Sequence, residues 1–315
     1  MTGTKAWKRN IIHIFPQRFH SLLEGMESDY PLEEIRIRIN GHIRCVFGSD
    51  VRTVGVSEEK YMVNQNDCLF ILEKICCHSL YAWEEELRNG FITLSGGYRV
   101  GLCGKAIIEG GRFKRLANTT YFNIRIAHEC KGCADALMKH IVTVDGAPLS
   151  TLLISPPGGG KTTMLRDIAR QLSYGLNGAM PCKVSIIDER AEIAGCWQGI
   201  PQNDVGPNSD VLDSCPKTIG IRLLLRTMSP DVIVTDEIGG SEDAEAILEA
   251  SNCGAAIIAT AHGSSVDSLS TRQALKRLIN DGVFRRIITL RRRRGVSELM
   301  EILHVDSKDQ VNRVG

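Results

Sequence analysis

The early part of the chain alternates hydrophobic and polar residues with the period of a half-buried β-strand. Residues 34–39 read Glu-Ile-Arg-Ile-Arg-Ile, and a second alternating stretch at 43–47 follows the dipeptide Asn40-Gly41. Two such stretches around Asn-Gly are the usual sequence signature of a β-hairpin. Hydrophobic residues then recur at helical spacing over 66–88. Further strands, punctuated by glycines, are expected at 91–94, 98–108 and 122–126.

The pattern changes after residues 144–148, which read Val-Asp-Gly-Ala-Pro. Short, uninterrupted hydrophobic runs now alternate with longer segments suited to loops and helices; the runs are 151–154, 184–187, 232–235 and 256–260. Such runs predict a parallel sheet with helices on both faces and a ligand site at the carboxyl ends of its strands. Residues 287–290 and 299–305, with a turn at Arg294-Gly295, predict a closing hairpin.

We therefore expect an α/β protein with two domains. A smaller mixed α+β domain spans 1–143, a linker spans 144–148, and a parallel-sheet domain spans 149–315. We see no internal repeat and no low-complexity segment.

The composition is that of an ordinary globular protein, with 43% hydrophobic and 24% charged residues. A net charge of +1 gives no general electrostatic case for nucleic-acid binding, which would need a local basic patch. No apolar run approaches the roughly 18 residues of a membrane span, and the N-terminus lacks a signal peptide's apolar core. We expect a cytoplasmic protein.

The eleven cysteines follow no repeated framework, and we expect reduced thiols. Cys130 and Cys133 form an isolated C-x-x-C. A structural zinc site would need a second pair at suitable spacing. Core or surface thiols are the better interpretation.

The most specific motif directly follows the apolar run at 151–154. It reads Ser155-Pro156-Pro157-Gly158-Gly159-Gly160-Lys161-Thr162-Thr163 and precedes an amphipathic segment. Strand, glycine-rich loop and helix in this order predict a phosphate-binding loop (P-loop), whose N–H groups and helix N-terminus face an oligophosphate. Lys161 would contact the terminal phosphates and Thr162 would hold Mg²⁺. The generic pattern has glycine where this chain has Ser155.

Acidic residues decide what a P-loop protein does with its nucleotide. The run at 232–235 ends in Asp236-Glu237, so Asp236 can hold the magnesium shell and Glu237 can orient and deprotonate a water. A helix-capping pair is the alternative. The run at 184–187 ends in a second acidic cluster that contains Asp188, Glu189 and Glu192. This cluster can supply a metal contact or share the role of base, or it can be a solvated helix start.

One histidine and several arginines are further candidates. His262 follows the last apolar run and would face the same crevice, either as a sensor of the γ-phosphate or in a packing role. Arg226, Arg99 and Arg125 are candidates to neutralise charge on the transferring phosphoryl group, with solvated arginines as the alternative. The dense basic run 291–294, with Arg285-Arg286 before it, can contact an anionic partner or form a solvated hairpin tip.

Taken together, these motifs resemble the stage III sporulation protein AA family of endospore-forming bacteria, which is related to the ATPases of type II and type IV secretion systems. The resemblance covers nearly the whole chain. It is carried by the P-loop with Ser-Pro-Pro before its glycines, by Asp-Glu-Arg-Ala-Glu-Ile at 188–193, and by segments at 34–38, 97–101, 123–127, 211–217, 228–231, 236–239 and 260–263. On this resemblance Ser155 is the family's usual residue.

The resemblance implies a P-loop NTPase domain with a RecA/AAA-like sheet that uses ATP and Mg²⁺. By similarity, Asp188, Glu189 and Glu192 match an acidic box, Glu237 the catalytic carboxylate and His262 a strand-end histidine, while Arg99 and Arg125 match arginines that approach the nucleotide. The chain departs from the pattern near Asn208, where an arginine is expected.

Relatives in the secretion group act as rings, usually hexamers. The resemblance therefore also implies a ring, membrane-protein partners, and a cytoplasmic ATPase of the mother cell in a secretion-like complex that faces the forespore. Two other functions stay open from the residues alone. One is a nucleic-acid-dependent ATPase that uses the basic run, although nucleic acid is the less expected partner. The other is a nucleotide-stabilised scaffold with little turnover.

Overall fold

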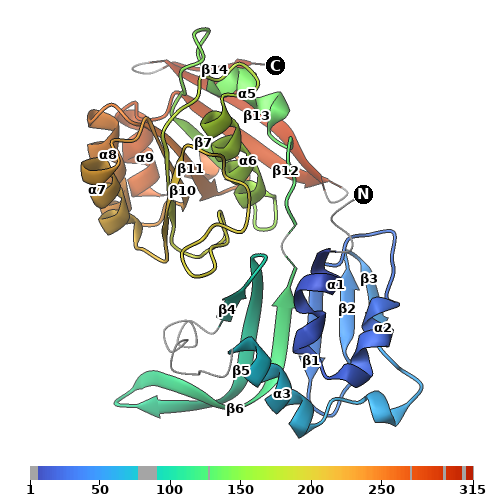
Figure 1. The fold of residues 1–315 in the computed structure, drawn as a ribbon. Coiled ribbons are helices and arrows are strands. Elements are labelled where there is room, and N and C mark those ends of the chain that lie inside the picture. The colour runs from blue at the N-terminus through green and yellow to red at the C-terminus, as the bar shows by residue number, and fades with distance from the viewer. Residues whose placement is uncertain are drawn as a thin grey trace. The chain divides into compact units, whose positions relative to one another are not determined.

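The computed structural model describes residues 6–76, 91–126, 128–269, 272–293, 296–306 and 310–314. The chain divides into two compact units, Met1–Glu129 and Cys130–Gly315. Figure 1 shows the elements of both units.

The first unit contains an antiparallel sheet of order β3-β2-β1-β6-β5-β4. Ile35 and Ile37 of β1 are buried, while Arg36 between them is exposed, so the alternation in the sequence sets the inner face of the sheet. The helices are α1 (Ala6–Ile11), α2 (His20–Glu24) and α3 (Gln65–Ile75). The strands are β1 (Glu34–Arg38), β2 (Arg44–Phe47), β3 (Asp50–Thr53), β4 (Phe91–Leu94), β5 (Tyr98–Glu109) and β6 (Arg112–Arg125).

The expected hairpin is confirmed, because β1 pairs with β2 in antiparallel register. Helix α3 begins where a capping box joins Asn64 and Asp67. It ends at Ile75, and residues 77–88 of the helix expected over 66–88 lie outside the described residues. Strand β6 begins at Arg112, earlier than the predicted 122, because it pairs with β5 along its whole length.

The second unit contains a sheet of order β14-β13-β12-β7-β11-β10-β8-β9. Strands β12, β7, β11, β10, β8 and β9 run parallel, and β13 and β14 close the sheet antiparallel. The strands are β7 (Thr151–Ser155), β8 (Val184–Asp188), β9 (Ser209–Asp213), β10 (Val232–Glu237), β11 (Ala256–His262), β12 (Arg286–Arg293), β13 (Val296–Asp306) and β14 (Gln310–Val314). The parallel sheet and the closing hairpin are as expected, and the hairpin's turn at Arg294-Gly295 lies outside the described residues.

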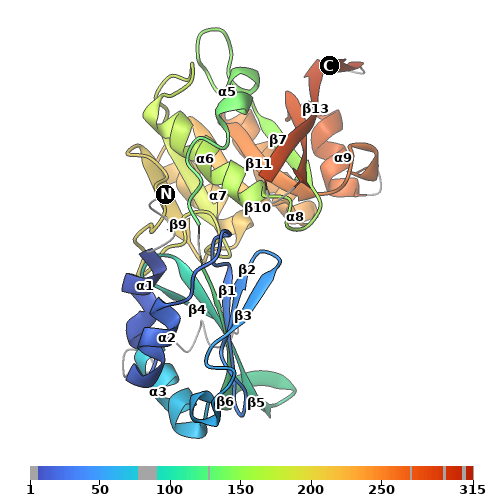
Figure 2. The same cartoon turned by 90° about the vertical axis from the view of Figure 1, so that its right-hand side faces the viewer.

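Helices cover both faces of this sheet (Figure 2). Leu153 of β7 packs in one cluster with α5 (Asp135–Ile141) and α6 (Lys161–Tyr174). Its neighbours Leu152 and Ile154 pack in another cluster with α7 (Lys217–Thr227), α8 (Ser241–Asn252) and α9 (Gln273–Asn280). Successive residues of a strand face opposite sides of the sheet. The residues of this continuous apolar run are therefore buried beneath helices on both faces.

The division between the units falls earlier than the linker 144–148 expected from the sequence. Leu137, Met138 and Ile141 of α5 are buried in the core of the second unit, so this helix belongs with the parallel sheet. Among the described residues, no helix combines the length and hydrophobicity that a membrane span requires.

Candidate nucleotide site

The glycine-rich loop joins the carboxyl end of β7 to the first residue of α6. Gly158 and Gly160 have φ values of +72° and +85°, in the left-handed region that favours glycine. A Cβ on Gly159 would lie 2.2 Å from the Ser155 hydroxyl oxygen. Gly158 and Gly160 are therefore needed for their backbone conformation and Gly159 for lack of space, and the loop has the strand–loop–helix setting of a P-loop.

Ser155 fills the position at which the generic P-loop pattern has glycine. Its side chain is buried, and its hydroxyl donates to the carbonyl of Pro156 at 2.9 Å. The serine hydroxyl therefore makes a hydrogen bond within the loop and lies close to Gly159.

Lys161, the first residue of α6, is 8% exposed and lies along the loop. Its Nζ donates to the carbonyls of Ser155 (2.7 Å) and Pro156 (3.3 Å) and to Nδ1 of His262 (2.9 Å). Burial lowers the pKa of Lys161 from its ordinary value, while the charge of Glu237 opposes this shift.

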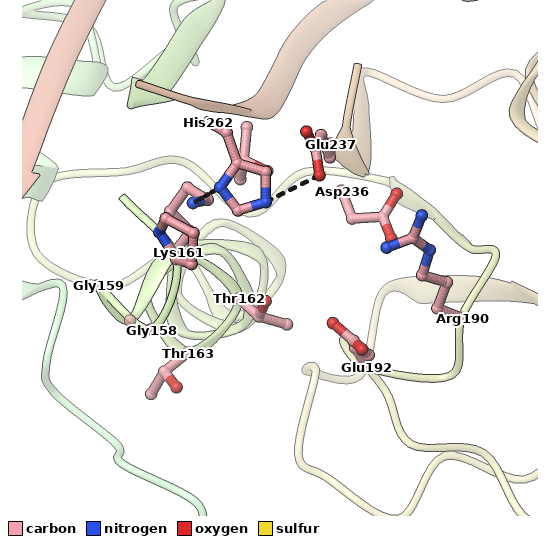
Figure 3. A pocket seen from close by; sticks show the side chains of 13 residues that line it. Gly158, Gly159, Lys161, Thr162, Thr163, Arg190, Glu192, Asp236, Glu237 and His262 are labelled. Atoms are coloured by element: carbon pink, nitrogen blue, oxygen red, sulfur yellow. Dashed lines mark hydrogen bonds and ion pairs between the residues drawn. The ribbon is translucent and has the colours of Figure 1, made fainter. Parts of the chain in front are cut away.

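His262, at the end of β11, connects the P-loop lysine to the carboxylate of Glu237, as Figure 3 shows. Its Nε2 lies 3.0 Å from Oε2 of Glu237. Because an ammonium group only donates, Nδ1 accepts from Lys161 and the ring proton of neutral His262 lies on Nε2, facing Glu237. Arg272 approaches the other carboxylate oxygen of Glu237 at 3.8 Å. His262 therefore holds a defined orientation between the loop and the strand-end acid.

Asp236 precedes Glu237 on β10 and is 7% exposed. Its Oδ1 forms an ion pair with Nζ of Lys217 at 2.8 Å, and Lys217 also contacts Glu189. Burial raises the pKa of Asp236 above its ordinary value, although Lys217 opposes the shift. Burial by itself would lower the pKa of Lys217, but the two carboxylates outweigh it and raise that pKa.

The acidic segment after β8 folds around the carboxylate of Asp188, which is fully buried. This carboxylate accepts the backbone N–H groups of Glu192, Ile193, Ala194 and Gly195 at 2.8–3.3 Å. Arg166 of α6 donates to the carbonyls of Glu192 and Ile193, which fastens the segment to the helix of the P-loop. Asp188 therefore organises backbone, and the side chains that reach the pocket from this segment are Arg190 and Glu192.

These groups surround a pocket of about 370 Å³. It is lined by residues 157–163 and by Arg190, Glu192, Asp236, Glu237, Thr260 and His262. The structure thus brings together the P-loop, one acid of the cluster at 188–192, both strand-end acids and the histidine named from the sequence. Asp188 and Glu189 are beside this pocket rather than in its wall.

The remaining arginines named from the sequence lie elsewhere. Arg226 is exposed on α7 and does not line the pocket. Arg99 and Arg125 are cross-strand neighbours in the first unit, where Arg99 lies 4.0 Å above the ring of Phe91 and Arg125 lies 3.9 Å from Glu34. Asn208 binds the end of α6 through the hydroxyl and carbonyl of Ser173, outside the pocket wall.

Three charged residues of the site were not assigned a role from the sequence: Arg190, Lys217 and Arg272. Arg190 lies within the acidic motif 188–192, in which only the carboxylates were candidates from the sequence. Lys217 reaches Asp236 from the first turn of α7, and Arg272 reaches Glu237 from the extended residue before α9. No local spacing signals such contacts.

The donor atoms in the pocket suit Mg²⁺, which prefers oxygen ligands and is usually held by one or two carboxylates together with phosphate oxygens. Thr162, Asp236 and Glu192 all line the pocket. Among the described residues, no group of three histidine, cysteine or acidic side chains could hold a metal on its own. The residues present therefore fit a magnesium ion that is shared with a nucleotide.

The parallel sheet with a P-loop between β7 and α6 defines the chain as a P-loop NTPase by fold. Its fold is similar to that of the ATPase DotB of Yersinia pseudotuberculosis (TM-score 0.59, 18% identity, 87% of this chain and 76% of that chain). It is also similar to that of the pilus retraction motor PilT solved with bound ADP (TM-score 0.59, 15% identity, 95% of this chain and 84% of that chain). At these identities the likeness concerns the fold alone.

More narrowly, the chain belongs to the family described as sporulation stage III, protein AA, whose model matches residues 5–309. It is 42% identical over 298 residues to the stage III sporulation protein AA of Bacillus subtilis (strain 168), covering 94% of this chain and 95% of that protein. A stretch of 153 residues is 28% identical to type II secretion system protein E of Dickeya dadantii (strain 3937), covering 48% of this chain and 28% of that protein. The family resemblance read from the motifs is confirmed.

Proposed function

We propose that this protein is a Mg²⁺-dependent ATPase. The observation that carries the proposal is the pocket in which the P-loop residues Lys161 and Thr162 face the strand-end acids Asp236 and Glu237, with His262 between loop and acid. The names of the fold relatives, an ATPase and a motor with bound ADP, support this choice of nucleotide.

Each group has a distinct role in the proposed reaction. The loop N–H groups and Lys161 would bind the phosphates, and Thr162, Asp236 and Glu192 would hold the metal. When bound there, Mg²⁺ would neutralise part of the negative charge of the phosphates. Glu237 orients and deprotonates the attacking water, while His262 and Arg272 fix the direction of its carboxylate.

We further propose that the ATPase works as the cytoplasmic motor of a sporulation-specific, secretion-like complex between mother cell and forespore. In this proposal the chain assembles into a ring, with a hexamer as the expected form, and docks on membrane-protein subunits. Arg99, Arg125 and Arg226 would then act at nucleotide sites shared by neighbouring subunits. The family description and the likeness to the pilus retraction motor support this wider role.

The test is steady-state release of phosphate from ATP and Mg²⁺ across a series of protein concentrations. Glu237→Gln should lower kcat by about 10²- to 10⁴-fold and retain nucleotide binding, because it removes the base and keeps the shape. Lys161→Ala should lose nucleotide binding. The matched control is Glu249→Gln, an exposed carboxylate paired with Arg222, which should retain full turnover. Nucleotide binding without turnover at any concentration, with Glu237→Gln equal to wild type, would contradict the ATPase and favour a scaffold.

A further inference from the structure

Lys217 is a buried lysine that lies behind the wall of the nucleotide pocket. It is 5% exposed and is the first residue of α7, directly after Pro216. It does not line the pocket. A buried ammonium group is retained only when it is paired, so its partners indicate what it does.

Both partners of Lys217 are carboxylates: Asp236 lines the pocket and Glu189 lies beside it. Its Nζ lies 2.8 Å from Oδ1 of Asp236, at the carboxyl end of β10, and contacts the carboxylate of Glu189, directly after β8. One lysine thus connects α7, the acidic segment after β8 and the strand that carries Asp236 and Glu237.

The packing of α7 explains how this side chain reaches the carboxyl ends of two strands. A Cβ at Gly220 would lie 3.1 Å from Cγ2 of Ile187, so a glycine at this position lets the helix approach β8 closely. Ile221 and Leu224 hold the helix in the core on the same side. The first turn of α7 is therefore fixed against the sheet, and the position of Nζ follows from it.

The contact also selects one oxygen of the Asp236 carboxylate. Oδ1 is buried and faces Lys217. Asp236 nevertheless lines the pocket, which leaves Oδ2 as the oxygen for the metal shell. Removing Lys217 would release the carboxylate to rotate about its own axis and would leave a buried negative charge without its partner.

We propose that Lys217 is a positioning residue for the magnesium site: it orients Asp236 toward the metal shell and ties that carboxylate to the acidic segment through Glu189. This inference rests on the proposed nucleotide function. It assigns Lys217 no contact with nucleotide or metal.

The experiment is a Mg²⁺ titration of the full chain with a fluorescent, non-hydrolysable ATP analogue, which measures binding without turnover. Lys217→Met should raise the Mg²⁺ concentration for half-maximal analogue binding by about 10- to 100-fold, as expected when a partner that orients a metal ligand is lost. Binding measured without Mg²⁺ should stay within about twofold of wild type, because the P-loop is untouched. The matched control is Arg222→Met on the same helix, whose ion pair with Glu249 is exposed at the surface.

If Lys217→Met does not fold, Lys217→Arg decides the matter, because it keeps the charge but replaces a compact ammonium by a planar guanidinium. It should fold and raise the Mg²⁺ midpoint by a smaller factor. A folded variant with an unchanged midpoint and only a lower melting temperature overturns the inference and leaves the proposed function standing. A wild-type protein that binds no nucleotide with or without Mg²⁺ overturns both.

Discussion

Asp188 and Glu192 are close in sequence and of the same chemical type, yet their carboxylates face different surroundings. The Asp188 carboxylate has no exposure and is surrounded by backbone N–H donors, so it holds the segment 192–195 in place. Glu192 lies at the pocket wall as a consequence of that fold. At the scale of single residues, the buried Asp188 holds the segment in place and the partly exposed Glu192 faces the pocket.

This difference predicts different effects for two isosteric substitutions. Asp188→Asn replaces one accepting oxygen by an NH₂ group, which cannot accept the backbone N–H groups that point at it. The substitution should therefore lower the free energy of unfolding by about 2–4 kcal/mol. Glu192→Gln should change that free energy by less than about 0.5 kcal/mol, because it leaves the fold intact. It should instead raise the Mg²⁺ requirement of nucleotide binding. Urea denaturation and a Mg²⁺ titration of both variants are the measurements. An Asp188→Asn protein of wild-type stability with reduced turnover would instead place Asp188 in the chemistry.

At the scale of elements, α5 and α6 are joined by the carboxylate of Asp167 on α6. It is 3% exposed and accepts the N–H of Ala134 (2.9 Å) and the side chains of Arg170 and Gln171 (both 2.8 Å). Burial alone would raise the pKa of Asp167. The hydrogen bonds outweigh burial and leave this pKa below its ordinary value of 3.8. The ionised form is therefore stabilised by folding.

A carboxyl group with a lowered pKa in the folded state adds stability above its ordinary pKa, and this stability is lost as the pH falls through the folded pKa. Asp167→Asn should lower the free energy of unfolding at pH 7 by about 2–4 kcal/mol. The difference in free energy of unfolding between variant and wild type should then narrow as the pH falls below 3.8. Urea denaturation between neutral and acid pH tests this, with the exposed Asp145→Asn as control. A gap that stays constant across this range would contradict the role of Asp167.

The elements that could be predicted from the sequence are those with a clear local pattern of hydrophobic residues or a recognisable motif. Strand β1 alternates, the P-loop has its own motif, and β7, β8, β10 and β11 are uninterrupted apolar runs. Strand β9 was not predicted, because it is an edge strand reading Ser-Asp-Val-Leu-Asp whose residues are all only partly buried. Its hydrophobic pattern is too weak to differ from that of a loop.

The same distinction applies to the candidate site. The P-loop, Asp236, Glu237 and His262 lie at strand ends that a parallel sheet must bring to one edge, so their meeting could be predicted. The ion pair of Lys217 with Asp236 depends on how closely α7 packs on β8, which no sequence period encodes. The different surroundings of Asp188 and Glu192 depend on the conformation of the segment that follows β8, which the sequence pattern does not encode.

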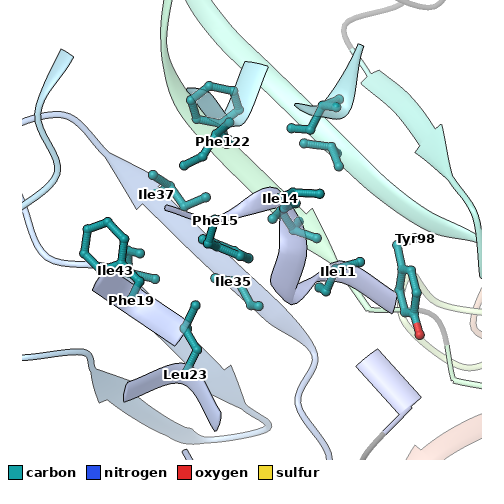
Figure 4. Packing of buried hydrophobic residues seen from close by; sticks show 14 of the residues in the cluster. Ile11, Ile14, Phe15, Phe19, Leu23, Ile35, Ile37, Ile43, Tyr98 and Phe122 are labelled. Carbon is teal, nitrogen blue, oxygen red and sulfur yellow. The ribbon is translucent and has the colours of Figure 1, made fainter. Parts of the chain in front are cut away.

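At the scale of the whole molecule, each unit has its own hydrophobic core. Figure 4 shows that of the first unit, where Phe15, Phe19 and Phe122 pack with isoleucines of the sheet. Every residue of this core lies before the division at Glu129, and every residue of the two clusters around the parallel sheet lies after it. Each unit therefore has the apolar interior that independent folding requires.

The position of α5 makes this division testable with two fragments. Fragment 130–315 retains the helix, whereas fragment 144–315 begins at the linker expected from the sequence and loses Leu137, Met138 and Ile141, each no more than 2% exposed. Burial of each such side chain contributes about 1.5–3 kcal/mol, so their joint loss costs at least about 4.5 kcal/mol, which approaches the total stability of many domains. Fragment 130–315 should unfold in one cooperative thermal transition, and fragment 144–315 should melt about 10–20 °C lower or fail to fold. Equal melting temperatures for the two fragments would show that α5 adds nothing to this core and would return the boundary to 144–148.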